Sequence, residues 1–496
     1  MILGKSYLSV YNSHVVYISS ADFSLMPNLQ NVIRNIHKDS CFSDISLCQQ
    51  NPCQSYLIIY FDKEITDINI LKDMEEGNAK GKISAFLSVE YFDDIAEIYN
   101  VCTERSQRKK GIMKKIFQAM FKEFPSNEYW LGVLLNNPFL NDALSLYLKV
   151  NFKPIGIAYT TPHGQTVTTP FISLYVDTIT EQYENLYINN NKKYIDSMIS
   201  FYKKSRDMCS INLNLSKETV DYIYENYIEE DVEYGGAMDL VKERDFYSLQ
   251  ITSVTKGTQN FQIKIPMYYI NWHTHPNICY IKNRCFIGWP SGMDMKYILL
   301  GYNKGLLLHF LFSKEGIYGI NLSTNMATLL KFLRHDHINQ ISEWVAFHFG
   351  SLENFREVKY DKDRLDCLQR TNDLNCYTYV DSFLNKNIEQ IINYINTFTL
   401  KELMTTYPSG TPSTKIDEIK GYLEKARRDV IRSDINRDIL DFNFPIFSSV
   451  FRYAKEARAS DTNFPFNFIV PPINSHCPLP VKNSPISFFE RTSEIL

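Results

Sequence analysis

Strand-like segments, in which apolar and polar residues alternate, are interspersed with amphipathic helical segments along the first 178 residues. The strand-like segment ISAFLSVEYF is followed by the helix-like KKIFQAMFKEF and then by the strand-like YWLGVLL. A hydrophobic period that switches between 2 and about 3.6 residues indicates strands and helices that pack on one another. The alternation therefore predicts an α/β domain at residues 1–178.

The chain has 496 residues, enough for about two to four domains. After the first domain we expect a polar helical connector at residues 179–207 and a second domain of mixed strands and helices at residues 208–325. Residues 326–496 carry helical patterns and end in a Pro-rich segment. The predicted fold class is multidomain α/β with a helix-rich C-terminal region, whose extended tail is a candidate docking segment for a protein partner.

Charge and hydropathy exclude several classes of partner. The formal net charge of −4 argues against a dedicated nucleic-acid binder, which needs a broad basic surface. The longest apolar stretch, Tyr297 to Phe312, is interrupted by Asn303, Lys304 and His309 and is too short and too polar to span a bilayer. The N-terminus lacks the continuous apolar stretch of a signal peptide. We expect no nucleic acid, no membrane and a cytoplasmic location.

The ten cysteines lie at irregular spacings, without a CxxC pair. In a chain without a secretory signal, this pattern favours reduced thiols. Cys41, Cys48 and Cys53 gather loosely, and we interpret them as buried or loop thiols.

A candidate phosphate-binding loop lies in the segment IAEIYNVCTERSQRKKGIMKKIFQAMF, residues 95–121. An apolar strand ends near Cys102, a polar turn and Gly111 follow, and an amphipathic helix begins. Backbone N–H groups at such a bend, together with the helix N-terminus, favour phosphate oxygens. Gly111 lets a ligand approach the backbone because it has no Cβ.

Two motifs in this region resemble those of the GNAT acetyltransferases, over roughly residues 55–178. Arg108-x-x-Gly111-x-Met113 is similar to their acetyl-CoA loop [QR]-x-x-G-x-[GA], and Ala143, Leu146, Tyr147 and Phe152 match their N-x-x-A-x-x-L-Y-x-x-x-G-F segment. The resemblance implies a mixed sheet with helices and a general acid, Tyr147, that protonates the leaving thiolate. It also implies that acetyl-CoA binds the residues of the loop, which are Arg108, Lys109, Lys110, Gly111, Ile112 and Met113.

The GNAT pattern is broken at three positions. Met113 replaces a small residue, Leu140 replaces an Asn, and Asn151 replaces the Gly before the Phe. Tyr147 also has a second interpretation, as a helix residue that packs on the sheet.

A candidate metal site begins with Asn271-Trp272-His273-Thr274-His275-Pro276, after an apolar strand. Because side chains alternate along a strand, His273 and His275 point to one face and can bind one metal ion. His335-Asp336-His337 has the same spacing, but we interpret it as a solvated helix face.

Three further residues complete the chemistry of a zinc site. Ser291 begins a helix, and Asp294 lies in its first turn; alone, this S-x-x-D pattern indicates a capping box. Two histidines and one oxygen ligand also make up a catalytic zinc site, in which a fourth position is left for water. Glu233, in front of a Gly pair, is a candidate base for that water.

The order Glu, H-x-H-P, S-x-x-D resembles the JAMM (MPN-type) zinc metalloisopeptidases over residues 208–325. The resemblance implies a cytidine-deaminase-like sheet flanked by helices, and substrates that are conjugates of ubiquitin or ubiquitin-like proteins. It implies that Zn²⁺ is bound by His273, His275 and Asp294. It further implies that Glu233 is the general acid/base and that Ser291 stabilises the oxyanion.

The spacing departs from this family, because fifteen residues rather than seven separate the second His from the Ser. The inserted residues 277–289 would lie at the mouth of the cleft.

Our main interpretation of the chain is a zinc-dependent isopeptidase. The alternatives are an acetyl-CoA-dependent N-acetyltransferase and a non-enzymatic scaffold with two degenerate enzyme folds. The abundance of Asn, Ile, Lys, Tyr and Phe suggests an AT-rich genome, such as that of a large DNA virus, and hence host cytoplasm or virion.

Overall fold

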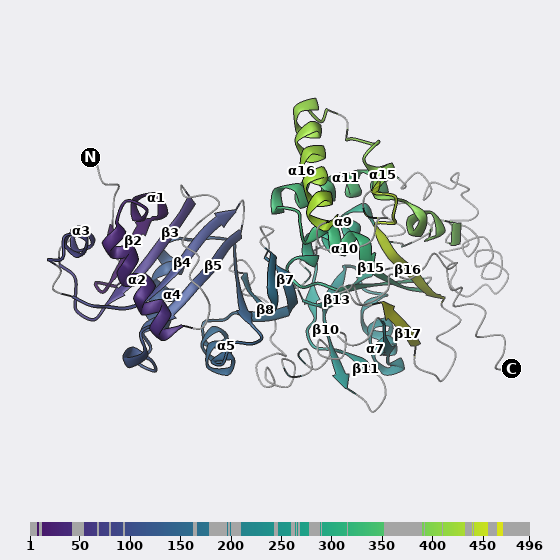
Figure 1. Cartoon of the computed structure of the whole chain (residues 1–496). Coiled ribbons are helices and arrows are strands. Elements are labelled where there is room, and N and C mark those ends of the chain that lie inside the picture. The colour runs from purple at the N-terminus through teal and green to yellow at the C-terminus, as the bar shows by residue number, and fades with distance from the viewer. Residues whose placement is uncertain are drawn as a thin grey trace, which may run out of the picture. The chain divides into compact units, whose positions relative to one another are not determined.

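The computed structural model divides into two compact units, Met1–Tyr183 and Glu184–Leu496 (Figure 1). It describes residues 7–8, 12–41, 54–66, 69–78, 81–92, 95–161, 166–177, 196, 199, 210–242, 247–258, 263, 265, 268–276, 288, 290–314, 316–351, 389–390, 392–408, 410–431, 439, 441–454 and 464–469. Most of the predicted connector and the Pro-rich tail beyond residue 469 lie outside the described residues, as does the inserted loop apart from Gly288.

The first unit is built on a mixed sheet in the order β1-β2-β3-β4-β5-β6-β8-β7. Neighbouring strands are antiparallel except for β5 and β6, which are parallel. The strands are β1 (Tyr7–Leu8), β2 (Val15–Ser19), β3 (Ser55–Phe61), β4 (Ile83–Phe92), β5 (Ile95–Thr103), β6 (Glu128–Leu134), β7 (Lys153–Thr160) and β8 (Thr166–Asp177). The mixed sheet with helices is the fold class predicted for this region.

Helices cover this sheet through their apolar stripes. They are α1 (Ser20–Phe23), α2 (Pro27–Ser40), α3 (Ile70–Glu75), α4 (Ile112–Glu123) and α5 (Leu140–Lys149). Leu29 and Ile33 of α2 are fully buried in a cluster with residues of β2, β3 and β4. Helix α4 packs on β3, β4 and β5, which fixes the position of its N-terminus beside the end of β5.

The second unit is built on a larger mixed sheet in the order β16-β15-β14-β13-β10-β11-β9-β17, with β12 paired to β10. The strands are β9 (Ser210–Leu215), β10 (Tyr234–Lys242), β11 (Tyr247–Ile251), β12 (Thr255–Lys256), β13 (Ile270–His275), β14 (Leu308–Ser313), β15 (Gly316–Leu322), β16 (Phe447–Ala454) and β17 (Phe464–Ile469). The last two strands come from the region predicted to be helix-rich, and they join the sheet beside β15 and β9.

The described helices of the second unit are α7 (Lys217–Tyr227), α9 (Gly292–Tyr302), α10 (Thr324–Leu330), α11 (His335–Ser351), α15 (Leu400–Leu403) and α16 (Ser413–Ile431). Among them, α11, α15 and α16 lie in the C-terminal region that was predicted to be helix-rich. Ser216 caps α7, because its side chain accepts a hydrogen bond from the N–H of Thr219. Buried residues of α9, β14, α11 and α16 share one apolar core. Within the described residues, no helix is long and apolar enough to cross a bilayer.

Strand β13 begins at Ile270, directly after Tyr268 and Tyr269. The hydroxyls of Tyr268 and Tyr269 both donate to Oδ1 of Asp239, at 2.6 Å each. Two consecutive side chains of a strand point to opposite faces, so two that share one acceptor atom are incompatible with regular strand alternation.

Candidate functional site

Strand β13 presents Asn271, His273 and His275 on one face, because residues two apart share a face of a strand. The Nε2 atoms of His273 and His275 lie 3.2 Å apart. Strand β14 runs parallel to β13, with His309 directly opposite Asn271. Parallel strands need a crossover connection, and α9 supplies it, so the helix begins at the edge of the sheet where β13 ends.

The first turn of α9 adds Asp294 to the two histidines. The side chain of Ser291 accepts from the N–H of Asp294 at 3.3 Å, and Oδ2 of Asp294 accepts from the N–H of Ser291 at 2.6 Å, which completes a capping box. The same carboxylate reaches the histidines, with Oδ1 at 3.3 Å from Nε2 of His273 and Oδ2 at 3.8 Å from Nε2 of His275. The capping box and the approach to the histidines therefore coexist.

The spacing of these atoms fits a tetrahedral metal ion. One ligand atom from each of His273, His275 and Asp294 lies within 4.8 Å of the other two. Zinc ligands at about 2.0–2.1 Å from the ion lie about 3.3 Å from one another. Nδ1 of His275 donates to the carbonyl of Gly288 at 2.9 Å. Because a carbonyl can only accept, the neutral ring carries its lone pair on Nε2, towards the other two ligands.

Burial and charge set the protonation states of the cluster. Burial lowers the pKa values of His273 and His309 to about 4, against the attraction of Asp294. Burial opposes ionisation of Asp294, but the surrounding histidines and the N–H of Ser291 outweigh it and lower the pKa to about 2. Neutral imidazoles beside a carboxylate are the forms that bind metal.

The register of β10 places Glu233 beside this cluster. Gly235 lies opposite His273 in the antiparallel pairing of β10 with β13. Continuing that register by two residues puts Glu233 opposite His275 and on the face of the two histidines. Glu233 is 8% exposed. Glu233 is not among the residues of the ligand cluster.

The Gly pair after Glu233 allows the strands to approach closely. A Cβ on Gly235 would lie 2.7 Å from the carbonyl oxygen of Trp272, and one on Gly236 would lie 1.8 Å from that of Ser253. No side chain fits at either position, so Gly235 allows β10 to lie close to β13 and Gly236 allows it to lie close to the backbone of Ser253.

Sequence reasoning missed two residues that support the cluster. Nδ1 of His273 lies 2.8 Å from Nε2 of His309, and Nδ1 of His309 lies 2.7 Å from Oδ1 of Asn271. His309 is fully buried, as is Asn271. The available signal was a polar residue inside each of two apolar strands, since such residues require a partner in the interior.

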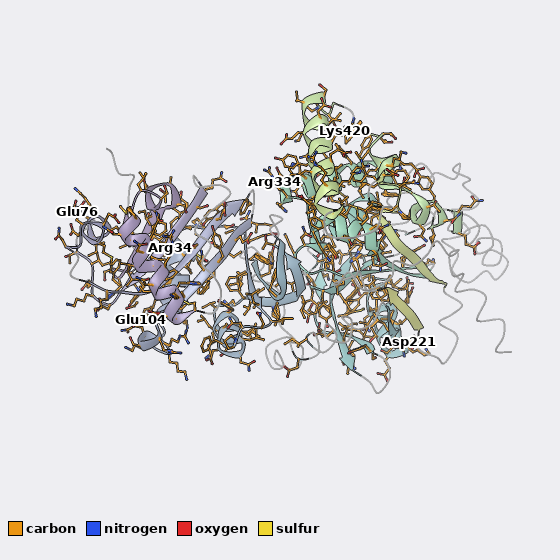
Figure 2. All side chains as sticks on the ribbon, in the orientation of Figure 1. Arg34, Glu76, Glu104, Asp221, Arg334 and Lys420 are labelled. Carbon is orange, nitrogen blue, oxygen red and sulfur yellow. A yellow bond between two sulfur atoms is a disulfide. The ribbon has the colours of Figure 1, made fainter. Side chains whose placement is uncertain are left out.

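The interpretation of His335-Asp336-His337 as a solvated helix face is wrong for His337. This ring is 2% exposed and stacks on Tyr422, with centroids 3.6 Å apart. Asp336, His337 and Glu418 form a second group of ligand types among the described residues. The carboxylate of Asp336 is already paired with the guanidinium of Arg334, which is labelled beside α11 in Figure 2.

In the first unit, the predicted phosphate loop joins β5 to α4. Helix α4 begins after Gly111, whose φ of +73° is in the left-handed region, and no side chain caps it. The N–H groups of the first helical turn therefore lack a side-chain partner, which favours an anion there. Lys109 and Lys110 are exposed in this loop, whereas Met113 is 5% exposed and packs in the interior.

Arg108 anchors the loop to the rest of the unit. Its guanidinium donates to the backbone carbonyls of Ser40 and Thr103 and lies 4.4 Å from the ring centroid of Phe139. Lys109 and Lys110 are the exposed cations of the loop, and Nζ of Lys110 donates to Oε1 of Gln107 at 2.9 Å.

Strands β5 and β6 pair over only part of their length. The described pairs join Ile95–Ile98 to Glu128–Leu131, and the remainder of the two strands forms no pair with each other in the described sheet. Left-handed Asn100, with φ +53°, lies where the register between β4 and β5 shifts. The C-terminal end of β5, which pairs with β4 and not with β6, leads into the loop before α4.

Tyr147 of α5 has the packing role that sequence analysis gave as its alternative. It meets Phe117 and Phe152 edge to face, at 5.9 and 6.2 Å between centroids. Burial raises its pKa well above the usual range, so the phenol stays protonated. Asn151 has φ +71°, a conformation that Gly adopts freely and Asn tolerates, which explains how it replaces the expected Gly.

The expectation of reduced thiols is wrong for one pair of cysteines. Cys41, which follows α2, forms a disulfide with Cys102 near the end of β5. The two residues are 61 positions apart in sequence, so their spacing alone gave no signal of the pairing. The bond ties α2 to the strand that leads into the phosphate loop.

The chain has only distant similarity to the known proteins that it matches. No family model matches the chain. Uncharacterized protein 3R of Frog virus 3 (isolate Goorha) is 26% identical over 166 residues, which are 33% of this chain and 32% of that protein. The match thus spans about a third of the relative's length. A viral relative agrees with the source suggested by the composition.

Among the similar solved structures are N-acetyltransferases. The Escherichia coli ribosomal-protein-S18-alanine N-acetyltransferase is 14% identical, with 33% of this chain and 92% of that chain covered and a TM-score of 0.22. A chain of the NatC complex bound to Gag peptide and CoA is 15% identical, with 33% of this chain and 98% of that chain covered and a TM-score of 0.23. Arabidopsis thaliana NAA60 with a bisubstrate analogue is 14% identical, with 33% of this chain and 98% of that chain covered and a TM-score of 0.23. The zinc interpretation rests on the geometry of the second unit alone.

Proposed function

We propose that the second unit is a zinc-dependent hydrolase of peptide or isopeptide bonds. The observation that carries this proposal is the convergence of His273, His275 and Asp294, whose ligand atoms lie within 4.8 Å of one another. The choice of ubiquitin or ubiquitin-like conjugates as substrates rests on the resemblance of the Glu, H-x-H-P, S-x-x-D order to the JAMM enzymes.

The residues of the chain divide the chemistry among them. Zinc at the three ligands would polarise a water and lower its pKa to about 7. The carboxylate of Glu233 takes a proton from the attacking water and returns it to the leaving amine. Oγ of Ser291 accepts from the N–H of Asp294, which leaves its own O–H to donate to the developing oxyanion.

The test is cleavage of a panel of di-ubiquitins and short peptides by the zinc-loaded full chain and by Glu233→Gln. General acid/base catalysis contributes about 10²–10⁴-fold, so turnover should fall by that factor while zinc content is unchanged. Glu225→Gln is a matched control, because this glutamate of α7 is exposed and is not part of the ligand cluster. Equal turnover by wild type and Glu233→Gln, or no hydrolysis of any substrate by the zinc-loaded protein, would overturn the proposal.

A second candidate function is favoured by the geometry of the first unit. We propose that the loop before α4 binds the pyrophosphate of acetyl-CoA for N-acetyl transfer. An uncapped helix N-terminus, left-handed Gly111 and exposed Lys109 and Lys110 support an anion there. By the GNAT resemblance, Tyr147 is the candidate acid for the leaving thiolate, in addition to its packing against Phe117 and Phe152.

Thermal unfolding of the full chain with acetyl-CoA tests this second function. A ligand at 100 times its Kd stabilises the native state by about 2.7 kcal/mol, so the melting temperature should rise. Lys109→Glu/Lys110→Glu should abolish the rise, and Lys63→Glu/Lys149→Glu, two exposed lysines elsewhere in the unit, should retain it. No rise in the wild type at millimolar acetyl-CoA would contradict the assignment.

A further inference from the structure

A buried chain of hydrogen bonds runs from the backbone to the candidate ligand His273. It begins at the carbonyl of Ile265, which lies 3.3 Å from the hydroxyl of Tyr297, and Nδ2 of Asn271 lies 3.0 Å from the same hydroxyl. Oδ1 of Asn271 lies 2.7 Å from Nδ1 of His309, and Nε2 of His309 lies 2.8 Å from Nδ1 of His273. Four side chains from β13, α9 and β14 are thus linked in series.

The direction of every bond follows from the first acceptor. The carbonyl of Ile265 can only accept, so the hydroxyl of Tyr297 donates to it and accepts from Nδ2 of Asn271. The amide oxygen of Asn271 then accepts from Nδ1–H of His309. Each step uses the donor and acceptor groups of the side chains once.

The same logic fixes both histidines of the chain. A neutral imidazole that donates through Nδ1 has its lone pair on Nε2, so Nε2 of His309 accepts from Nδ1–H of His273. His273 in turn has its lone pair on Nε2. This is the atom that lies 3.3 Å from Oδ1 of Asp294 and 3.2 Å from Nε2 of His275.

We propose that His309 is a positioning residue that holds His273 in the tautomer and orientation needed to bind the metal. This inference rests on the proposed zinc site and extends it to a residue outside the H-x-H-P and S-x-x-D motifs. Partners that accept from the second ring nitrogen of a metal-bound histidine fix its orientation and raise its basicity, and their loss typically costs about 10–100-fold in metal affinity.

The helix α9 contributes twice to this arrangement. Asp294 and Tyr297 are three positions apart on one helix face, so they meet His273 and Asn271 respectively across the same side of β13. The helix therefore supplies one candidate ligand directly and orients another through Asn271 and His309. His275 does not depend on this chain, since Gly288 accepts from its Nδ1.

The experiment measures the affinity of the metal-free full chain for Zn²⁺ and Co²⁺ by competition with a chelator. His309→Leu removes the acceptor for Nδ1–H of His273, and affinity should fall about 10–100-fold. His309→Gln keeps an acceptor and a donor in a side chain of similar reach, and it should recover most of the affinity. The absorption spectrum of bound Co²⁺ should change in His309→Leu and resemble wild type in His309→Gln.

Thermal unfolding of the metal-free proteins separates positioning from packing. A purely structural role would lower the melting temperature of both variants and leave the affinity of the folded protein unchanged. Wild-type affinity in His309→Leu would overturn the positioning role and leave the zinc site in place. Absence of metal binding by the wild type would overturn the zinc site and the role of His309 together. If His309→Leu fails to fold, His309→Asn replaces it in the comparison, because its shorter side chain holds the amide farther from His273. Equal zinc affinities of His309→Gln and His309→Asn would then overturn the positioning role.

Discussion

Oδ1 of Asp294 lies 3.3 Å from Nε2 of His273, while Oδ2 of the same carboxylate accepts the N–H of Ser291 at 2.6 Å. One side chain therefore caps helix α9 and completes the candidate metal cluster. The cap fixes the carboxylate at the end of β13, so the helix start and the ligand position are set by a single contact. Because one carboxylate makes both contacts, the S-x-x-D pattern is consistent both with a capping box and with part of a metal motif.

Substitutions at Asp294 should separate its two roles. Asp294→Asn keeps an oxygen that can accept from Ser291, so the free energy of unfolding of the metal-free protein should change by less than about 1 kcal/mol. The neutral amide is a weaker ligand, so zinc affinity should fall at least about tenfold. Asp294→Ala should lose zinc and also about 1 kcal/mol of cap stability. Wild-type stability and wild-type zinc affinity in both variants would show that the carboxylate has neither role.

The glycine pair after Glu233 should be intolerant of any side chain. Gly236→Ala would place Cβ 1.8 Å from the carbonyl oxygen of Ser253, a backbone atom that cannot move without displacing β10. Overpacking of this kind typically costs about 1–3 kcal/mol, and a backbone clash should reach or exceed the upper value. Gly421→Ala, on α16 with nothing within 4 Å of its Cβ, is the control and should be neutral or stabilising. Denaturant unfolding measures both, and a tolerated Gly236→Ala would contradict the strand register.

Asn151 should be replaceable by Gly but not by a β-branched residue. Its φ of +71° costs an ordinary L-residue about 1–2 kcal/mol. Asn151→Gly should therefore leave the stability of the first unit within about 0.5 kcal/mol of wild type, whereas Asn151→Val should lower it by at least about 1 kcal/mol. Similar melting curves for the Gly and Val variants would argue against the left-handed turn before Phe152.

The disulfide between Cys41 and Cys102 should stabilise the first unit under oxidising conditions. Closing a loop of 61 residues removes unfolded-state entropy worth about 4 kcal/mol at 25 °C. Cys41→Ser/Cys102→Ser, or a reductant, should lower the melting temperature of this unit. Intact-mass analysis with and without thiol alkylation checks the bond itself. Alkylation of both cysteines in the folded, oxidised protein would exclude it.

Local patterns predicted much of the fold, because they are set by residues close in sequence. The helix after Ser216 and the strand–loop–helix at Gly111 follow from capping and hydrophobic period. The support of His273 by His309 could not be predicted, because the two histidines are 36 residues apart in sequence and meet through the parallel pairing of β13 with β14. The disulfide and the burial of His337 against Tyr422 depend on tertiary packing in the same way.

The metal content of the purified full chain tests the central claim most directly. Elemental analysis should find about one zinc per chain in the wild type. His273→Ala/His275→Ala should contain almost none, because it removes two of the three candidate ligands. His335→Ala/His348→Ala removes two histidines outside the cluster and should keep the wild-type content. A wild-type protein that stays metal-free after incubation with zinc, or a His273→Ala/His275→Ala protein that keeps its zinc, would contradict the account.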